Sequence, residues 1–171
     1  MNLQNKTLLM AGAFFACIAM ANSSCAQKQN SKTMEKQNEN LAFYGVRYIV
    51  NDLDAAVSFY KDLLGFTVDI KVAPGFARLT KGNLHLYLNK PGFGGAGLSM
   101  PDGAAPAPGG WSRIMLEVDN LEATIATLKS KKAHFRNDLV TGQGGKLILL
   151  QDPSDNLIEL FEPNEIAKSL K

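Results

Sequence analysis

Two stretches of the sequence decide the fold: VRYIVNDLDAAVSFYKDLL, residues 46–64, and IMLEVDNLEATIATLKSKK, residues 114–132. At a constant offset of 68 residues (114 − 46 = 68), apolar positions of the first stretch fall on apolar positions of the second, for example Val50 on Val118. Repeated supersecondary units usually bury their apolar faces against one another. The chain therefore contains a duplicated unit, and we expect a functional site between the copies.

Each copy has the order strand, helix and three strands. In the first copy, Asn51 or Asp52 can cap a helix through Leu64, because these side chains accept the free amide hydrogens of a first turn. Gly65 ends this helix, since glycine readily takes the left-handed conformation that closes a last turn. The helix of the second copy is predicted at 121–132. Strands are predicted at 41–50, 66–72, 76–80, 84–89, 113–118, 135–140, 146–151 and 157–161.

Composition and charge are those of an ordinary globular chain, with 171 residues, 46% hydrophobic and 20% charged, and a net charge of +2. The one basic cluster, at 129–132, lies at a predicted helix end, where the helix dipole favours cations. A nucleic-acid partner is therefore not expected. Both cysteines, Cys17 and Cys25, precede residue 26, so the rest of the sequence has no residue for a disulfide or a thiolate ligand.

The first 25 residues have the pattern of an export signal. Lys6 precedes an apolar run, 7–21, that is too short for a transmembrane helix. In one interpretation this is a lipoprotein signal with lipidation of Cys25, and in the other signal peptidase cleaves after Ala26. The polar segment 26–40 is predicted to form a flexible tether. The protein is therefore expected to be exported, either membrane-anchored through a lipid or periplasmic.

The remaining sequence is predicted to form one domain, residues 41–163, followed by a C-terminal tail at 164–171. Its two units span about 41–90 and 111–163. The connection between them, 91–110, is dominated by glycine, proline and alanine, which sustain neither regular structure. A connection of this length is either a lid or binding loop, or a mobile linker.

Three motifs resemble the vicinal oxygen chelate superfamily, which includes glyoxalases, extradiol dioxygenases, fosfomycin-resistance proteins and bleomycin-binding proteins. They are residues 50–53, 59–66 and 152–160, within a resemblance that covers roughly 43–163. The resemblance implies an α+β fold, the glyoxalase/bleomycin resistance/dioxygenase fold, in which tandem βαβββ units have curled mixed sheets that form a cup. It does not choose an activity, because one scaffold supports isomerisation, ring cleavage, epoxide opening and sequestration. Relatives often pair as homodimers.

Strand alternation predicts which side chains face the cup. Successive side chains point to opposite faces of a strand, so the apolar set that packs on the helix leaves the alternate set on the cup face. The closing strands match at an offset of 74 (159 − 85 = 74), which places His85 and Glu159 at corresponding positions. The cup-facing residues of the first and last strands are Gly45, Arg47, Ile49, His85, Tyr87, Arg113, Met115, Glu117, Glu159 and Phe161.

A metal site is the first function to consider for such a cup. In metal-dependent members of the superfamily, four ligands lie at positions that match Gly45, His85, Arg113 and Glu159. Glycine offers no side-chain ligand and arginine stays cationic, whereas such metals need several neutral or anionic donors. We therefore expect no cofactor. The alternative is a divalent metal held weakly by His85 and Glu159.

Polar side chains remain in the predicted cup. Arginine suits a carboxylate or phosphate, so the expected ligand is a small polar or anionic compound. His85 can act as a general base, and Glu159 is the second catalytic candidate. A structural alternative stays open, in which Arg113 pairs with Glu159 or Glu117. The predicted ligand-binding residues are Arg47, Tyr87, Trp111, Arg113, Glu117 and Phe161.

Three functions follow from these observations. The first is an exported glyoxalase/bleomycin-resistance-like protein that is metal-independent and binds or transforms a small compound in the cup. The second is a metal-dependent lyase or dioxygenase of the same superfamily, and the third is a non-catalytic envelope interaction module. A catalytic member would be a lyase or an oxidoreductase. At the predicted rim of the cup, Trp111 either covers a ligand or braces the connection.

Overall fold

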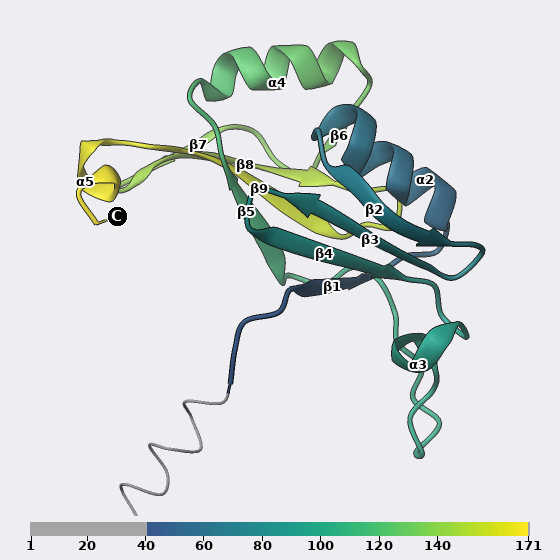
Figure 1. Cartoon of the computed structure of the whole chain (residues 1–171). Coiled ribbons are helices and arrows are strands. Elements are labelled where there is room, and N and C mark those ends of the chain that lie inside the picture. The colour runs from purple at the N-terminus through teal and green to yellow at the C-terminus, as the bar shows by residue number, and fades with distance from the viewer. Residues whose placement is uncertain (1–40, 171) are drawn as a thin grey trace, which may run out of the picture. The chain divides into compact units, whose positions relative to one another are not determined.

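The first unit forms a four-stranded mixed sheet in the order β1-β4-β3-β2 (Figure 1). The computed structural model describes residues 41–170, so the predicted signal, Cys25 and the tether lie outside the described residues. β1 and β4 pair in parallel, and the other neighbours are antiparallel. The strands are β1 (Val46–Ile49), β2 (Thr67–Val72), β3 (Phe76–Lys81) and β4 (Leu84–Asn89).

The second unit repeats this arrangement in the order β5-β9-β8-β6, with β7 also paired to β8. The parallel pair is now β5 with β9. Both sheets stay open instead of closing into barrels, which confirms the predicted tandem α+β fold. The strands are β5 (Arg113–Glu117), β6 (His134–Phe135), β7 (Val140–Gly142), β8 (Gly145–Gln151) and β9 (Leu157–Pro163).

Each unit carries one main helix that begins at a side-chain cap. Asp52 accepts two amide hydrogens at the start of α2 (Leu53–Ser58), which continues into a π-helical segment, η1 (Phe59–Leu63). Asn120 accepts one at the start of α4 (Leu121–Ser130). The two caps are 68 residues apart (120 − 52 = 68), so the repeat extends to the capping residues. Both helices lie on the same side of the sheets (Figure 1).

Buried hydrogen bonds join the two units. The Tyr48 hydroxyl on β1 donates to the Leu157 carbonyl at 2.8 Å and accepts from the Ile114 amide at 2.7 Å. The Tyr60 hydroxyl donates to Asp152, which is only 4% exposed. The motif that begins at Asp152 therefore has a structural role at the junction between the units.

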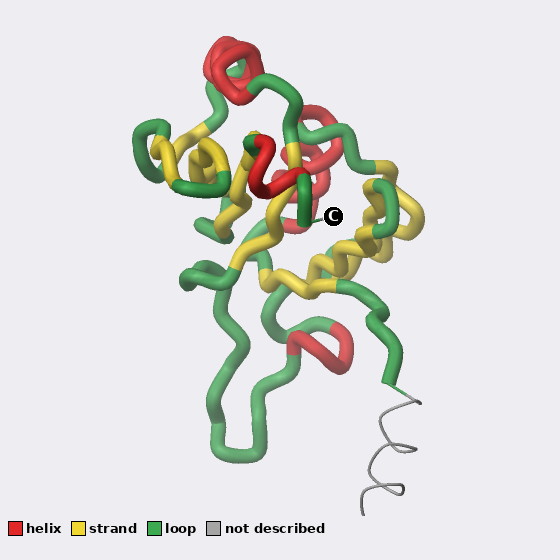
Figure 2. The backbone as a smooth tube through the Cα atoms, turned by 90° about the vertical axis from the view of Figure 1, so that its left-hand side faces the viewer, coloured by secondary structure: helices red, strands yellow, loops and turns green. Residues whose placement is uncertain are grey.

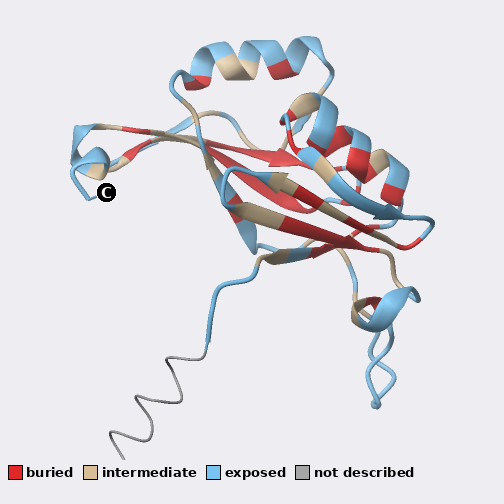
Figure 3. Cartoon of the chain, in the orientation of Figure 1, coloured by how far each residue is buried: buried red, intermediate tan, exposed pale blue. Residues whose placement is uncertain are grey.

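One apolar core spans both units. Buried side chains concentrate on the strands and on the helix faces turned toward them (Figure 3). Leu53 and Val50 of the first unit belong to the same cluster as Leu121 and Ile158 of the second. This shared core places the cup face on the side of the sheets away from the helices.

Three segments differ from the prediction. The connection 91–110 contains a one-turn helix, α3 (Gly94–Gly97), followed by an arm, residues 98–108, that projects from the body (Figure 2). The strand predicted at 135–140 is interrupted, because the Asn137 side chain accepts the Leu149 amide of β8 and replaces a backbone partner there. The tail forms a short helix, α5 (Glu165–Lys168), capped by Asn164. Within the described part of the chain, no helix has both the length and the apolar character needed to cross a membrane.

Candidate functional site on the cup face

Tyr87 is the central side chain of the cup face in the first unit. It is 8% exposed, stacks on Tyr44 with ring centroids 5.6 Å apart, and lies 6.3 Å from the Phe76 ring. The guanidinium carbon of Arg47 lies 5.3 Å from the Tyr87 centroid, and Arg47 Nη1 donates to the Asn89 side chain. Loss of hydration, followed by interaction with Tyr44, raises the pKa of Tyr87. The structure thus brings Arg47 and Tyr87 together.

Gly45 occupies a position with no room for a side chain. A Cβ atom there would lie 2.6 Å from the His85 carbonyl oxygen and 2.6 Å from Cε2 of Tyr87. Such distances are shorter than real contacts, so any larger residue would have to displace the backbone or the ring. The Tyr87 ring therefore fills the space that a side chain at Gly45 would need.

An ion pair between Arg113 and Glu159 dominates the cup face of the second unit. Arg113 Nε donates to Glu159 Oε2 at 2.6 Å, and Arg113 Nη1 donates to the Trp111 carbonyl at 3.3 Å. The Glu159 side chain is 4% exposed and that of Arg113 is 36% exposed. In the strand register, Arg113 lies opposite Leu157, so its side chain reaches along β9 to Glu159. Of the pairings left open by the sequence, this is the one that the structure contains.

His85 belongs to a hydrogen-bonded chain across three strands of the first sheet. Its Nδ1 lies 3.0 Å from Thr80 Oγ1, and Thr80 Oγ1 lies 2.5 Å from Asp69 Oδ2. Arg78 Nε donates to the same carboxylate oxygen at 3.0 Å. The hydrogen bond from Thr80, and then Arg78, lowers the pKa of Asp69. The sequence analysis missed Asp69 and Thr80, although alternation along β3 places Thr80 on the same face as Arg78.

A family match and several solved structures now identify the fold. Residues 42–160 match the model of the Glyoxalase/Bleomycin resistance protein/Dioxygenase superfamily. The chain belongs to this superfamily. A comparison with curated proteins finds no match.

Solved structures of the superfamily resemble the chain at low sequence identity. A lactoylglutathione lyase from Agrobacterium tumefaciens is 18% identical with a TM-score of 0.58, and the match covers 71% of this chain and 92% of that one. A superfamily member from Sphaerobacter thermophilus is 24% identical with a TM-score of 0.57 over 71% and 98%. TnmS3, an antibiotic-binding protein from Streptomyces, is 20% identical with a TM-score of 0.54 over 73% and 98%. These likenesses establish the shared fold.

The donor set of this superfamily member does not fit a metal ion of the kind that metal-dependent members hold. Gly45 supplies no donor and has no room for one, and Arg113 places a cation against Glu159. Over residues 41–170, no three side chains of His, Cys, Asp or Glu come close enough together to hold a metal. Divalent metals need several neutral or anionic donors around one point. His85 and Glu159 alone do not provide such a set.

The other predicted residues lie apart from these contacts. Trp111 is 68% exposed and borders a hollow of about 360 Å³ together with Arg136 and Gln151. Phe161 is partly buried on β9. Glu117, at the end of β5, lines a different hollow of about 510 Å³.

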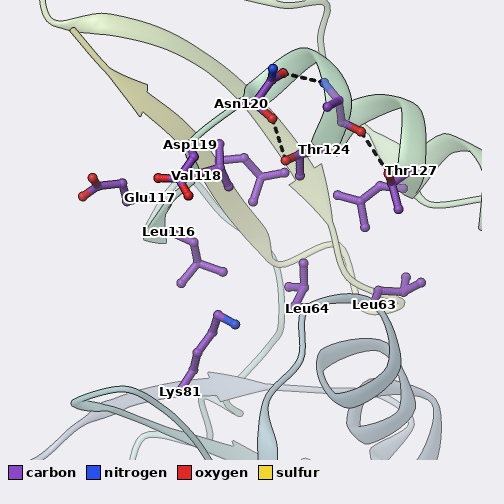
Figure 4. Close-up of a pocket in the computed structure, with 13 residues that line it drawn as sticks. Leu63, Leu64, Lys81, Leu116, Glu117, Val118, Asp119, Asn120, Thr124 and Thr127 are labelled. Atoms are coloured by element: carbon purple, nitrogen blue, oxygen red, sulfur yellow. Dashed lines mark hydrogen bonds between the residues drawn. The ribbon is translucent and has the colours of Figure 1, made fainter.

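The hollow beside Glu117 lies on the helix side of the sheets, between α4 and the end of η1 (Figure 4). Leu63 and Leu64 of the first unit face Leu116 of the second across it, and Lys81 extends toward it from below (Figure 4). Neither His85 nor Glu159 is among its lining residues. The hollow is therefore distinct from the cup face that carries the catalytic candidates.

Proposed function

We propose that this chain is an exported, metal-independent superfamily member that binds or transforms a small polar or anionic compound in the cup. The observation that carries the proposal is the ion pair of Arg113 with Glu159. It occupies two of the four positions at which metal-dependent members carry ligands, and the packed ring beside Gly45 closes a third. A cup that holds arginines in place of ligands is suited to an anion.

The arginines supply the chemistry for anion binding. A guanidinium group has five N–H donors, and the contacts of Arg47 and Arg113 use only some of them. Both residues are exposed at the cup face. Paired N–H donors match the two oxygens of a carboxylate or phosphate. The antibiotic-binding protein TnmS3 has this fold, which supports ligand binding as a sufficient function for the scaffold.

If the protein also transforms its ligand, His85 is the better proton acceptor of the two catalytic candidates. The Glu159 carboxylate is paired with Arg113, whose charge favours the ionised form and weakens it as a base. Histidine changes its protonation state near neutral pH. We therefore assign proton transfer to His85 and the positioning of Arg113 to Glu159.

Metal analysis and ligand-dependent melting test this proposal. Purified protein incubated with zinc, manganese, nickel and iron should retain no stoichiometric metal. Its melting temperature should rise with small carboxylates or phosphates and not with matched neutral compounds. Arg47→Gln should weaken this response, whereas Arg136→Gln, which changes an exposed arginine outside the cup, should leave it unchanged. Stoichiometric metal that stabilises the protein would instead favour the metal-dependent lyase or dioxygenase.

Export and lipid anchoring are part of the proposal and need a separate test. With a lipoprotein signal, the protein should fractionate with membranes, and Cys25→Ala should abolish this association. Cys17→Ala, which changes the other cysteine of the signal, is the matched control. The mass of the mature protein separates the two cleavage sites, because cleavage after Ala26 gives a periplasmic form without lipid.

A further inference from the structure

We propose that Asp69 and Thr80 hold neutral His85 with its proton on Nδ1, so that Nε2 is the bare hydrogen-bond acceptor in the cup. Asp69 and Thr80 would then be positioning residues that act through His85. The assignment of the tautomer rests on these three side chains alone. Its consequence for the ligand rests on the proposed function of the cup.

The geometry of three adjacent strands builds this chain of contacts. Thr80 on β3 lies directly opposite His85 on β4 in the antiparallel register. Asp69 lies on β2 where the register with β3 shifts between Val68 and Ile70. A bulge of this kind re-aims a side chain, and here the Asp69 carboxylate meets Thr80 and Arg78 on neighbouring β3.

Counting protons along the chain fixes the tautomer. An ionised carboxylate only accepts hydrogen bonds, so the proton between Asp69 and Thr80, whose oxygens lie 2.5 Å apart, belongs to the Thr80 hydroxyl. That hydroxyl has no second proton to donate. The 3.0 Å contact between Thr80 Oγ1 and His85 Nδ1 is therefore a hydrogen bond in which Nδ1 donates. In the neutral ring, Nε2 then carries only its lone pair.

The charges around His85 support an ionised Asp69. Arg78 donates to the same Asp69 oxygen as Thr80, and these contacts lower the pKa of the carboxyl group. Protonated Asp69 could donate to Thr80 and release the hydroxyl proton for Nδ1, which would reverse the chain. The Arg78 contact opposes this reversal at neutral pH.

A bare Nε2 narrows the class of ligand. It needs a partner that donates a proton, such as a hydroxyl or amide N–H. Arg47 pairs with Tyr87, two residues beyond His85 on β4, or roughly 7 Å along the strand. The compound that fits carries an anionic group for the arginine and a hydrogen-bond donor a few atoms away for His85.

Nuclear magnetic resonance of ¹⁵N-histidine-labelled protein tests the tautomer directly, because the chain has two histidines. Exposed His134 on β6 serves as the internal reference. At about pH 8, above the ordinary histidine pKa, long-range ¹H–¹⁵N spectra should show a protonated Nδ1 and an unprotonated Nε2 for His85. A protonated Nε2 in the unmodified protein would overturn the proposal.

Three variants give directional outcomes. Thr80→Val removes the hydroxyl at nearly constant volume and should move the His85 pattern toward that of His134. Asp69→Asn lets the amide donate to Thr80, so the hydroxyl proton turns to Nδ1 and the His85 proton should move to Nε2. Thr80→Ser should preserve the original pattern. Unchanged His85 signals in Thr80→Val, with native amide spectra, would refute the relay. Loss of anion binding with the tautomer intact would contradict the proposed function and leave the relay standing.

Discussion

The two units of the cup use corresponding strand positions for different chemistry. In the first unit, Gly45 yields its space to the Tyr87 ring, and a neutral His85 is held through Thr80. In the second, Arg113 and buried Glu159 form a charged pair. Helix-facing residues of both units share one close-packed core, which limits their divergence. The comparison shows that the duplicated frame is kept by packing, while the cup face is free to change.

The strand registers of the two units also differ. With β1 placed on β5 at the offset of 68, the paired residues Leu86 and Ile158 correspond at 72 (158 − 86 = 72). The offset of 74 from the closing motifs therefore aligns residue types and not strand partners. In register, Glu159 matches Tyr87, and the long Arg113 side chain covers the resulting stagger. Variants of each unit test how deep this asymmetry goes.

The largest effect is expected from Arg113→Ala. It leaves the Glu159 carboxylate buried without its cation, which should lower the free energy of unfolding by about 3 kcal/mol. Arg47→Ala, in the first unit, removes a cation whose partner Asn89 is neutral, and should cost less than about 1 kcal/mol. Urea denaturation measures both. Replacing Glu159 by leucine in the Arg113→Ala background should recover most of the loss, and equal losses in the two units would remove the contrast.

A somewhat smaller effect is expected at the junction, from Tyr48→Phe. This change removes the partner of the Ile114 amide and of the Leu157 carbonyl, at a cost of about 2 kcal/mol. Unfolding should remain a single transition, because both units share one core.

The junction also gives a pH dependence. Burial raises the pKa of Tyr48 from 10.0 to about 12, so the folded state favours the neutral phenol. Its contribution to stability is complete below pH 10 and is lost as the pH rises toward 12. The difference in unfolding free energy between wild type and Tyr48→Phe should shrink across this window. A constant difference would contradict the assignment.

Gly45→Ala tests the packing of the first unit alone. The added methyl group meets the His85 carbonyl and the Tyr87 ring, so we expect a loss of about 1–2 kcal/mol from overpacking. Gly95→Ala is the matched control, because a Cβ there meets nothing within 4 Å. Thermal denaturation compares the two. Equal stability of both variants would show that the Tyr87 ring moves aside without cost.

The smallest effects are expected at the helix caps, where the two units are most alike. Asp52 accepts two amide hydrogens and Asn120 accepts one. Asp52→Ala should therefore cost about 1 kcal/mol and Asn120→Ala about 0.5 kcal/mol. Chemical denaturation of the single variants and of the double variant measures both terms, and the double variant should show their sum. A larger loss for Asn120→Ala would reverse the order of the two units.

The sequence was sufficient for the frame and for part of the site. The spacing of apolar residues and of the Asp52 and Asn120 caps indicated the duplication, because local preferences and core packing agree there. Gly45 and Arg113 also indicated from residue type alone that the ligand set is incomplete. Asp69 was missed because a bulge in β2 breaks the alternation that assigns faces. The choice of Glu159 as the partner of Arg113 depends on a strand register that residue order does not encode.

The projecting arm, residues 98–108, has a consequence for protein engineering (Figure 2). Phe93 packs against Gly75 before the arm, and the Gly109 amide donates to Asn156 after it, so both ends are fixed to the body. The junction that joins the units, through Tyr48 and Asp152, does not involve the arm. We therefore expect a chain cleaved in the arm to stay assembled, and the two halves expressed as separate polypeptides to reconstitute the cup by fragment complementation.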